Sequence, residues 1–174
     1  MTTQTALWPD QLFDVLKRAH VRQVGYVPDA GHSRLIERCR ADADIHDVAL
    51  TTEEEGVALA AGAWLGGMRA ALLMQSSGVG NCINMLSLPR ICHMPMLMFI
   101  TMRGEWEEFN PWQVPMGSIV DPVLKLCEAQ VHRVRRPEEV APTAERAVRE
   151  AFGEERIVAV LLSQELIGKK VWTK

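Results

Sequence analysis

Residues 46–81 read HDVALTTEEEGVALAAGAWLGGMRAALLMQSSGVGN, and this stretch contains the patterns of a strand, a helix, a second strand and a glycine loop. His46–Leu50 is predicted to end a short apolar strand. Thr51–Thr52 supply hydroxyl groups at the start of a helix whose first turn holds three glutamates. The next strand, Ala70–Met74, leads directly into the loop Gln75–Asn81. This order predicts an open α/β sheet, in which ligands bind beyond the carboxyl ends of the strands.

The helix of this stretch has an unusually bare surface. Alanine occupies positions 58, 60, 61 and 63, and glycine occupies 56 and 62, so another backbone or a flat ligand can approach closely. Each of its three glutamates, Glu53, Glu54 and Glu55, also has an ordinary explanation, because carboxylates are favourable at the positive end of a helix.

The same alternation of strands and helices continues along the chain. Further strands are predicted at Val21–Val27, Met94–Met102, Gln130–Val134 and Ile157–Leu162, and helices at 8–19, 33–42, 79–88 (ended by Pro89), 119–128 and 137–152. Together they predict a doubly wound, mostly parallel six-stranded α/β sheet with helices on both faces, formed by a single domain over residues 1–174. Arg103–Gly117, rich in aromatic residues and proline, predicts a long functional loop.

The composition excludes several classes of protein. The net charge is −3 and the basic residues are scattered, which disfavours a nucleic-acid partner. No apolar run reaches the length of a membrane span, and no signal peptide is evident, so we expect a cytoplasmic protein. His93 beside Cys92 fits no standard metal-ligand spacing, and no metal site is predicted in this chain.

Two residues that follow strands are candidates for substrate binding. Arg103 could hold a carboxylate or sulfonate through paired N–H donors, or it could form a salt bridge with Glu105 or Glu107. His32 could bind substrate or transfer a proton, and a plain loop histidine is an equal alternative.

The motif Glu-x₆-Ala-Ala-Gly, followed by a strand and Ser-Gly-x-Gly-Asn, resembles the pyrimidine-binding domain of thiamine-diphosphate-dependent 2-oxoacid decarboxylases. The resemblance extends over about residues 24–134. RGEW (103–106) and FNPWQVPMG (109–117) make the alpha subunits of sulfopyruvate decarboxylase the closest likeness, with phosphonopyruvate decarboxylase next. The resemblance implies a carboxy-lyase.

The resemblance assigns roles to individual residues. The family's catalytic glutamate stands nine residues before the glycine matched by Gly62, which selects Glu53, with Glu54 or Glu55 as the alternative if the alignment slips. That glutamate holds the N1′ atom of the cofactor's aminopyrimidine. The glycine loop lies beside the cofactor's rings, which implies cofactor contacts at Gln75, Ser77, Gly78, Gly80 and Asn81.

The chain lacks one motif of the family. Such enzymes hold the cofactor's diphosphate through Mg²⁺ with a Gly-Asp-Gly motif, and no Gly-Asp-Gly occurs here. The resemblance therefore implies an alpha subunit that shares thiamine diphosphate with a beta subunit, and the beta subunit holds the Mg²⁺. The implied reaction converts 3-sulfopyruvate to sulfoacetaldehyde and CO₂. Phosphonopyruvate or another 2-oxoacid as substrate, or a non-catalytic binding module of the same fold, remain alternatives.

Overall fold

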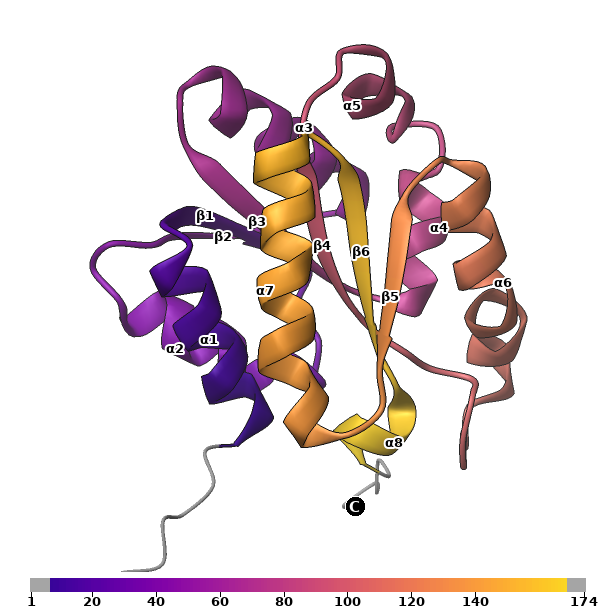
Figure 1. Cartoon of the computed structure of the whole chain (residues 1–174). Helices are drawn as coiled ribbons and strands as arrows, with labels where there is room; N and C mark the ends of the chain where they lie inside the picture. The colour runs from indigo at the N-terminus through magenta and orange to yellow at the C-terminus, as the bar shows by residue number, and fades with distance from the viewer. Residues whose placement is uncertain (1–6, 169–174) are drawn as a thin grey trace, which may run out of the picture.

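The centre of the molecule is a six-stranded sheet with the strand order β2-β1-β3-β4-β6-β5, and every pairing in it is parallel (Figure 1). The structure is a computed structural model that describes residues 7–168. The sheet confirms the predicted doubly wound α/β architecture. Because β2 lies on one side of β1 and β3 lies on the other, the chain reverses its winding direction between β1 and β3.

The strands agree closely with the sequence patterns. They are β1 (Val21–Tyr26), β2 (His46–Ala49), β3 (Arg69–Gln75), β4 (Met96–Thr101), β5 (Gln130–Val134) and β6 (Ile157–Leu162). Every residue of β4 and β6 is buried, because both strands are central and covered on both faces.

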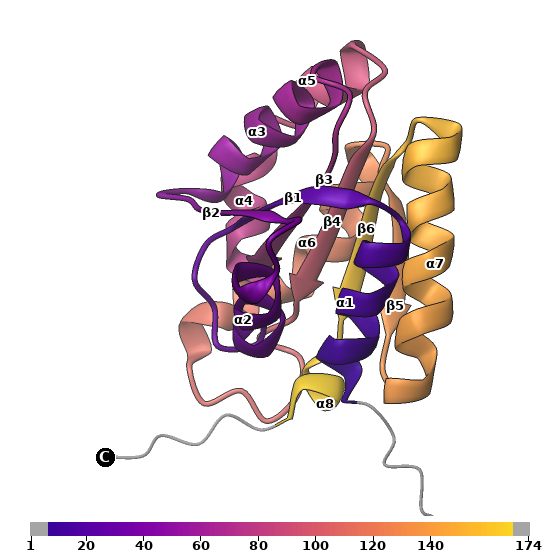
Figure 2. The same cartoon turned by 90° about the vertical axis from the view of Figure 1, so that its left-hand side faces the viewer.

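Helices cover the sheet in two layers, each with its own apolar cluster. Buried side chains of α1 (Trp8–Arg18), α2 (Ser33–Ala41) and α7 (Pro137–Glu154) form one cluster with the sheet. Those of α3 (Glu53–Leu65), α4 (Val79–Cys82) and α6 (Val114–Leu126) form the other. Figure 2 shows the sheet between α3 and α7. Within residues 7–168, no helix combines the length and apolar character that a membrane span requires.

Three segments differ from the sequence expectation. The helix predicted over 79–88 is only α4, and Pro89 does not end it but lies in a second short helix, α5 (Ser87–Ile91). Proline is tolerated there because the first turn of a helix needs no intrahelical N–H bond. The predicted loop 103–117 is shorter, since Pro111–Gln113 is a 3₁₀ helix and α6 begins at Val114. The short helix α8 (Gln164–Ile167) was not predicted. Ser163 caps its start, because Oγ of Ser163 accepts the N–H of Leu166 at 3.3 Å.

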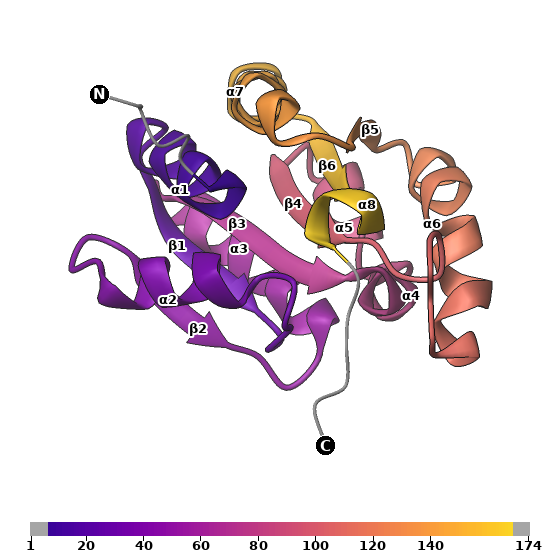
Figure 3. The ribbon, with the colours of Figure 1, turned by 90° about the horizontal axis from the view of Figure 1, so that it is seen from below.

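The packing of α3 on the sheet depends on a missing side chain. An ideal Cβ built on Gly56 would lie 2.3 Å from Cδ1 of Leu72 on β3, so only glycine lets the helix approach this closely. Because α3 follows β2 in a parallel sheet, its first turn lies at the carboxyl edge of the sheet. Figure 3 looks onto that edge, where α8 also lies.

Candidate active site

Burial separates the three glutamates at the start of α3. Glu53 is only 9% exposed, whereas Glu54 and Glu55 are exposed. Nδ2 of Asn81 donates a hydrogen bond to Oε2 of Glu53 at 2.8 Å. Glu55 instead reaches back to the preceding turn, where its Oε2 accepts the N–H of Thr51 at 2.8 Å. Glu55 is therefore a helix cap, and Glu53 is the carboxyl group that the fold turns inward.

The glycine loop packs directly against the Glu53 carboxyl group. A Cβ on Gly78 would lie 2.4 Å from Cγ, Cδ and Oε1 of Glu53, so any side chain at this position would displace the carboxylate. Cys82 lies in the turn behind the loop. Burial, together with the negative charges of Glu53 and Glu54, raises the pKa of the Cys82 thiol to about 12, which keeps it neutral.

The other predicted loop residues are more exposed. Ser77 and Gly80 lie at the surface, and the hydroxyl group of Ser77 donates to Oε1 of Gln75 at 3.0 Å. The neighbouring Ser76, which the sequence interpretation did not single out, is fully buried, and its Oγ accepts the N–H of Arg103 at 3.1 Å. The loop after β3 is thereby attached to the end of β4.

An aspartate joins the strands at the point where the winding direction reverses. Asp29, in the loop after β1, accepts a hydrogen bond from Nε2 of Gln75 at 3.1 Å and another from Oγ1 of Thr101 at 2.6 Å. The carboxylate thus ties together the ends of β1, β3 and β4. Sequence reasoning missed Asp29, although its position directly after an apolar strand is the same signal that selected His32.

A cleft of about 180 Å³ opens beside Asp29. Its lining comes from the ends of β1 and β4 and from α8, namely residues 29–31, 101–103, 164, 167 and 168. The loop Gln75–Asn81 connects this cleft to the buried glutamate, because Gln75 bonds to Asp29 and Asn81 bonds to Glu53. At the carboxyl edge of the sheet, one glycine loop therefore has the small cleft at its Gln75 end and the inward-facing Glu53 carboxyl group at its Asn81 end.

Arg103 forms a buried salt bridge with Glu108. Its Nε and Nη2 donate to the two carboxylate oxygens of Glu108 at 2.7 and 2.6 Å, and its guanidinium also lies 5.4 Å from the ring centre of Phe109. The paired N–H donors of Arg103 that were expected to hold a substrate anion are occupied by Glu108. The sequence had named Glu105 or Glu107 as the partner, and Glu105 pairs with Arg133 instead.

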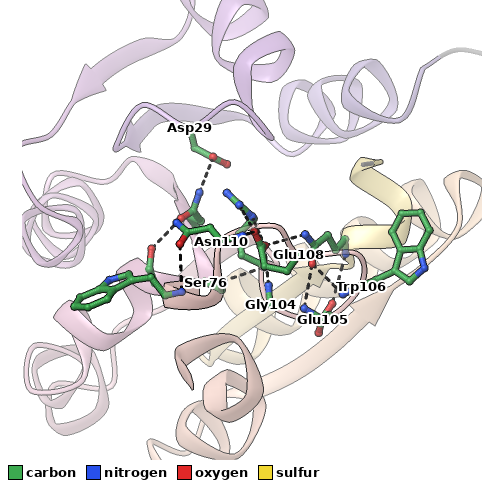
Figure 4. A network of polar contacts seen from close by, with 12 residues as sticks. Asp29, Ser76, Gly104, Glu105, Trp106, Glu108 and Asn110 are labelled. Atoms are coloured by element: carbon green, nitrogen blue, oxygen red, sulfur yellow. Dashed lines mark hydrogen bonds and ion pairs between the residues drawn. The ribbon is translucent and has the colours of Figure 1, made fainter. Parts of the chain in front are cut away.

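Glu108 is the centre of a larger network, shown in Figure 4. Its carboxylate, which is only 4% exposed, also accepts the backbone N–H groups of Gly104 and Asn110 and the side-chain amide of Gln164 at 2.9 Å. These donors, the salt bridge with Arg103 foremost, lower the pKa of Glu108 to about 2 despite its burial. Gln164 in turn accepts the N–H groups of Glu105 and Trp106, so the loop is fixed to α8.

His32 has no exposed surface in this structure. Its Nε2 lies 3.1 Å from the carbonyl oxygen of Phe99 on β4, and burial lowers the pKa of the ring. The imidazole is therefore neutral, with Nε2 as the donor to the carbonyl group. In this structure the imidazole has no exposed surface to offer a substrate, and the expected role of His32 in substrate binding or proton transfer stays a prediction.

Metal ligands are not gathered at this edge. Over the described range 7–168, no group of three or more histidine, cysteine, aspartate or glutamate side chains is arranged to hold a metal ion.

Comparison with known proteins finds relatives over most of the chain. It is 36% identical over 129 residues to the sulfopyruvate decarboxylase subunit alpha of Methanocaldococcus jannaschii, which covers 74% of this chain and 76% of that protein. It is 33% identical over 127 residues to the sulfopyruvate decarboxylase of Methanosarcina acetivorans, covering 72% of this chain and 31% of that longer protein. It is 37% identical over 112 residues to the phosphonopyruvate decarboxylase of Streptomyces viridochromogenes, covering 63% of this chain and 28% of that protein. No family model matches the chain.

Solved structures show the same fold at low sequence identity. The benzoylformate decarboxylase from Polynucleobacter necessarius has a TM-score of 0.74 and 19% identity, covering 98% of this chain and 32% of that one. The 2-oxoglutarate:ferredoxin oxidoreductase from Magnetococcus marinus has a TM-score of 0.73 and 12% identity, covering 93% of this chain and 29% of that one. In both proteins, the region that matches this chain is about a third of a longer chain.

Proposed function

The chain belongs to the family of sulfopyruvate decarboxylase alpha subunits, and from this membership we propose that it works with a beta subunit and thiamine diphosphate to convert 3-sulfopyruvate to sulfoacetaldehyde and CO₂. The observation that carries the proposal is the Glu53 carboxyl group, which is turned inward at the carboxyl edge, bonded to Asn81 and covered by the backbone of Gly78. A carboxyl group held in this way is suited to hold or exchange one proton with a ring nitrogen of a bound cofactor.

The residues present fit a flat heterocyclic ring. The missing side chain at Gly78 leaves the backbone in contact with the carboxylate, and Gly80 leaves a bare surface two residues further along. Asn81 fixes Oε2 of Glu53, which keeps the carboxyl group in one orientation. Glu53 would hold the N1′ atom of the aminopyrimidine, and Gln75 and Ser77 would supply polar contacts beside it. When bound, thiamine diphosphate supplies the electron sink for the pair released as the substrate's carboxylate leaves as CO₂.

The proposal also requires a second polypeptide. The chain contains no Gly-Asp-Gly motif for Mg²⁺ and diphosphate. We therefore assign Mg²⁺ and the diphosphate to the beta subunit and the aminopyrimidine to this chain, so that each subunit supplies part of one site. Arg103 and His32 are left out of the substrate-binding set, because the first is paired with Glu108 and the second is fully buried.

The test is a pair of matched variants in the reconstituted two-subunit enzyme. Glu53→Gln keeps the size and the hydrogen bonding of the side chain but removes its ability to exchange a proton, and should lower kcat by roughly a hundredfold or more. Glu54→Gln, one residue along and exposed, should leave kcat nearly unchanged. Both variants should keep the wild-type melting temperature and subunit assembly. Turnover by Glu53→Gln close to that of the wild type would refute the assignment.

Assays with three substrates separate the remaining alternatives. Release of CO₂ from sulfopyruvate, phosphonopyruvate and pyruvate is compared at equal concentration with both subunits present. A higher kcat/KM for phosphonopyruvate would assign the chain to that reaction instead. No turnover of any of the three, with the complex formed and the cofactor bound, would favour the non-catalytic binding module.

A further inference from the structure

Two neighbouring segments at the carboxyl edge contain no charged side chain. Residues 76–89, which include α4, and residues 109–120, which include the first half of α6, contain no aspartate, glutamate, lysine or arginine, in a chain that is 24% charged. The segments touch, because a Cβ on Gly80 would lie 3.3 Å from Sδ of Met116. Figures 1 and 3 both show α4 and α6 side by side.

These segments nevertheless expose large apolar side chains. Trp112 is 84% exposed and Ile119 is 46% exposed, and Ile83 and Val114 are also exposed. Ile83 and Ile119 each follow by one helical turn the residues that meet, Gly80 and Met116. We call Ile83, Trp112, Val114 and Ile119 the α4–α6 surface. A patch with an exposed tryptophan and without charges has the composition of the core of a protein interface.

The α4–α6 surface is preformed, because the start of α6 packs on the loop that follows β4. A Cβ on Gly117 would lie 1.9 Å from the carbonyl oxygen of Arg103, and a Cβ on Gly104 would lie 2.6 Å from the carbonyl oxygen of Gln113. Gly104 also has a φ of 76°, in the region that favours glycine. The start of α6 therefore lies directly on the backbone of the loop that Glu108 holds. A preformed surface loses little conformational entropy on binding.

We infer that the α4–α6 surface is the docking site of the beta subunit, and that docking there closes the Glu53 site. The inference rests on the proposed function. Asn81, which holds the Glu53 carboxylate, is an exposed residue of α4, so a chain seated on this surface would cover the Glu53–Asn81 pair. The energy of association comes from apolar burial around Trp112, since tryptophan is among the side chains that most often dominate an interface.

The relatives indicate which chain occupies this surface. In the sulfopyruvate decarboxylase of Methanosarcina acetivorans, the region that matches this chain is 31% of a longer polypeptide. The relatives that match this chain over most of their own length are named as alpha subunits, so their partner is a separate polypeptide that a non-covalent surface has to hold. A second copy of this chain would bring another Glu53 and no Gly-Asp-Gly motif, which would leave the same half of the site missing.

The experiment compares two substitutions on one helix. Ile119→Lys and Leu126→Lys place the same charge on exposed apolar positions of α6, but Leu126, 80% exposed, lies at its far end beside Lys125 and outside the surface. Each purified variant is titrated by calorimetry with the beta subunit of the same organism, the chain that carries Gly-Asp-Gly. We expect Ile119→Lys and Trp112→Ala to raise Kd by about 30-fold or more, and Leu126→Lys to change it by less than about twofold. Because the surface carries no charge, the wild-type Kd should change little between about 0.05 M and about 0.5 M NaCl.

Each other outcome is informative. Equal Kd values for Ile119→Lys and Leu126→Lys would overturn the inference while leaving the proposed function intact. Failure of the wild-type chain to bind the beta subunit would refute the two-subunit function itself. Sedimentation that shows the chain alone forming dimers, lost in Ile119→Lys while the affinity for the beta subunit is unchanged, would assign the surface to a second copy and overturn the inference.

Discussion

Replacing Glu108 with glutamine should destabilise the folded chain by about 3 kcal/mol at neutral pH. The salt bridge with Arg103 and the surrounding donors lower the pKa of Glu108 from 4.5 to about 2. Each unit of pKa difference between folded and unfolded states corresponds to about 1.4 kcal/mol, which leads to about 3 kcal/mol for this carboxyl group. Removal of one partner from a buried ion pair costs about 3–5 kcal/mol, a similar magnitude. Glutamine keeps the size of the side chain but leaves the Arg103 guanidinium without an opposite charge.

The effect should depend on pH in a defined direction. Because the folded-state pKa of Glu108 is depressed, its contribution is fully present above the unfolded value of 4.5 and is lost as the pH falls towards about 2. The free energies of unfolding of the wild type and of Glu108→Gln should therefore differ most at neutral pH and converge in acid. Below about pH 2 the protonated glutamate and the glutamine are nearly equivalent.

Urea unfolding followed by circular dichroism at a series of pH values measures both effects. Glu139→Gln is the matched control, because Glu139 also accepts backbone N–H groups and pairs with an arginine, Arg136, but does so at the surface. Its loss should be much smaller at every pH. A difference between wild type and Glu108→Gln that stays constant from neutral pH to acid would refute the reasoning, since it would mean that the loss does not come from the ionised carboxylate.

Two further substitutions test the packing at the carboxyl edge. Gly78→Ala places a Cβ at 2.4 Å from the Glu53 carboxyl group, and should lower the stability by about 1–3 kcal/mol and also lower turnover. Gly62→Ala, on the same helix as Glu53, meets nothing within 4 Å and should be tolerated. Equal melting temperatures and equal activities for the two variants would contradict the predicted contact. His32→Gln should lower stability at neutral pH by about 1–3 kcal/mol through the weakened bond to the Phe99 carbonyl group. Burial lowers the pKa of His32, so its neutral form stabilises the fold fully above the unfolded pKa of 6.5 and less as the pH falls below that value. In urea unfolding, the free energy of unfolding of His32→Gln should therefore depend less steeply on pH below about 6.5 than that of the wild type. An unchanged slope would indicate that the imidazole is protonated in the folded state.

The sequence determined the architecture because the signals that specify it are local. The spacing of apolar residues, the glycines after β3 and the threonines before α3 act within one or two turns of the chain, and all six strands lie where those patterns predicted them. The resemblance also selected Glu53 through a local spacing, since this glutamate stands nine residues before Gly62. The limits of the short helices were less predictable, as the segments around Pro89 and Pro111 show, since neighbouring packing decides whether a single turn forms.

Only the tertiary structure decided what each polar side chain does. Three adjacent glutamates look alike in the sequence, and only the packing of Gly78, on another element, shows that Glu53 is buried while Glu55 caps the helix. From the sequence, Arg103 was either a cation for the substrate or the salt-bridge partner of Glu105 or Glu107, and folding pairs it with Glu108. Asp29 bonds to Gln75 and Thr101, which lie 46 and 72 positions away, and no local pattern contains such contacts. Burial and pairing depend on which strands become neighbours, so the chemistry of a charged side chain is set by the sheet and not by its own segment.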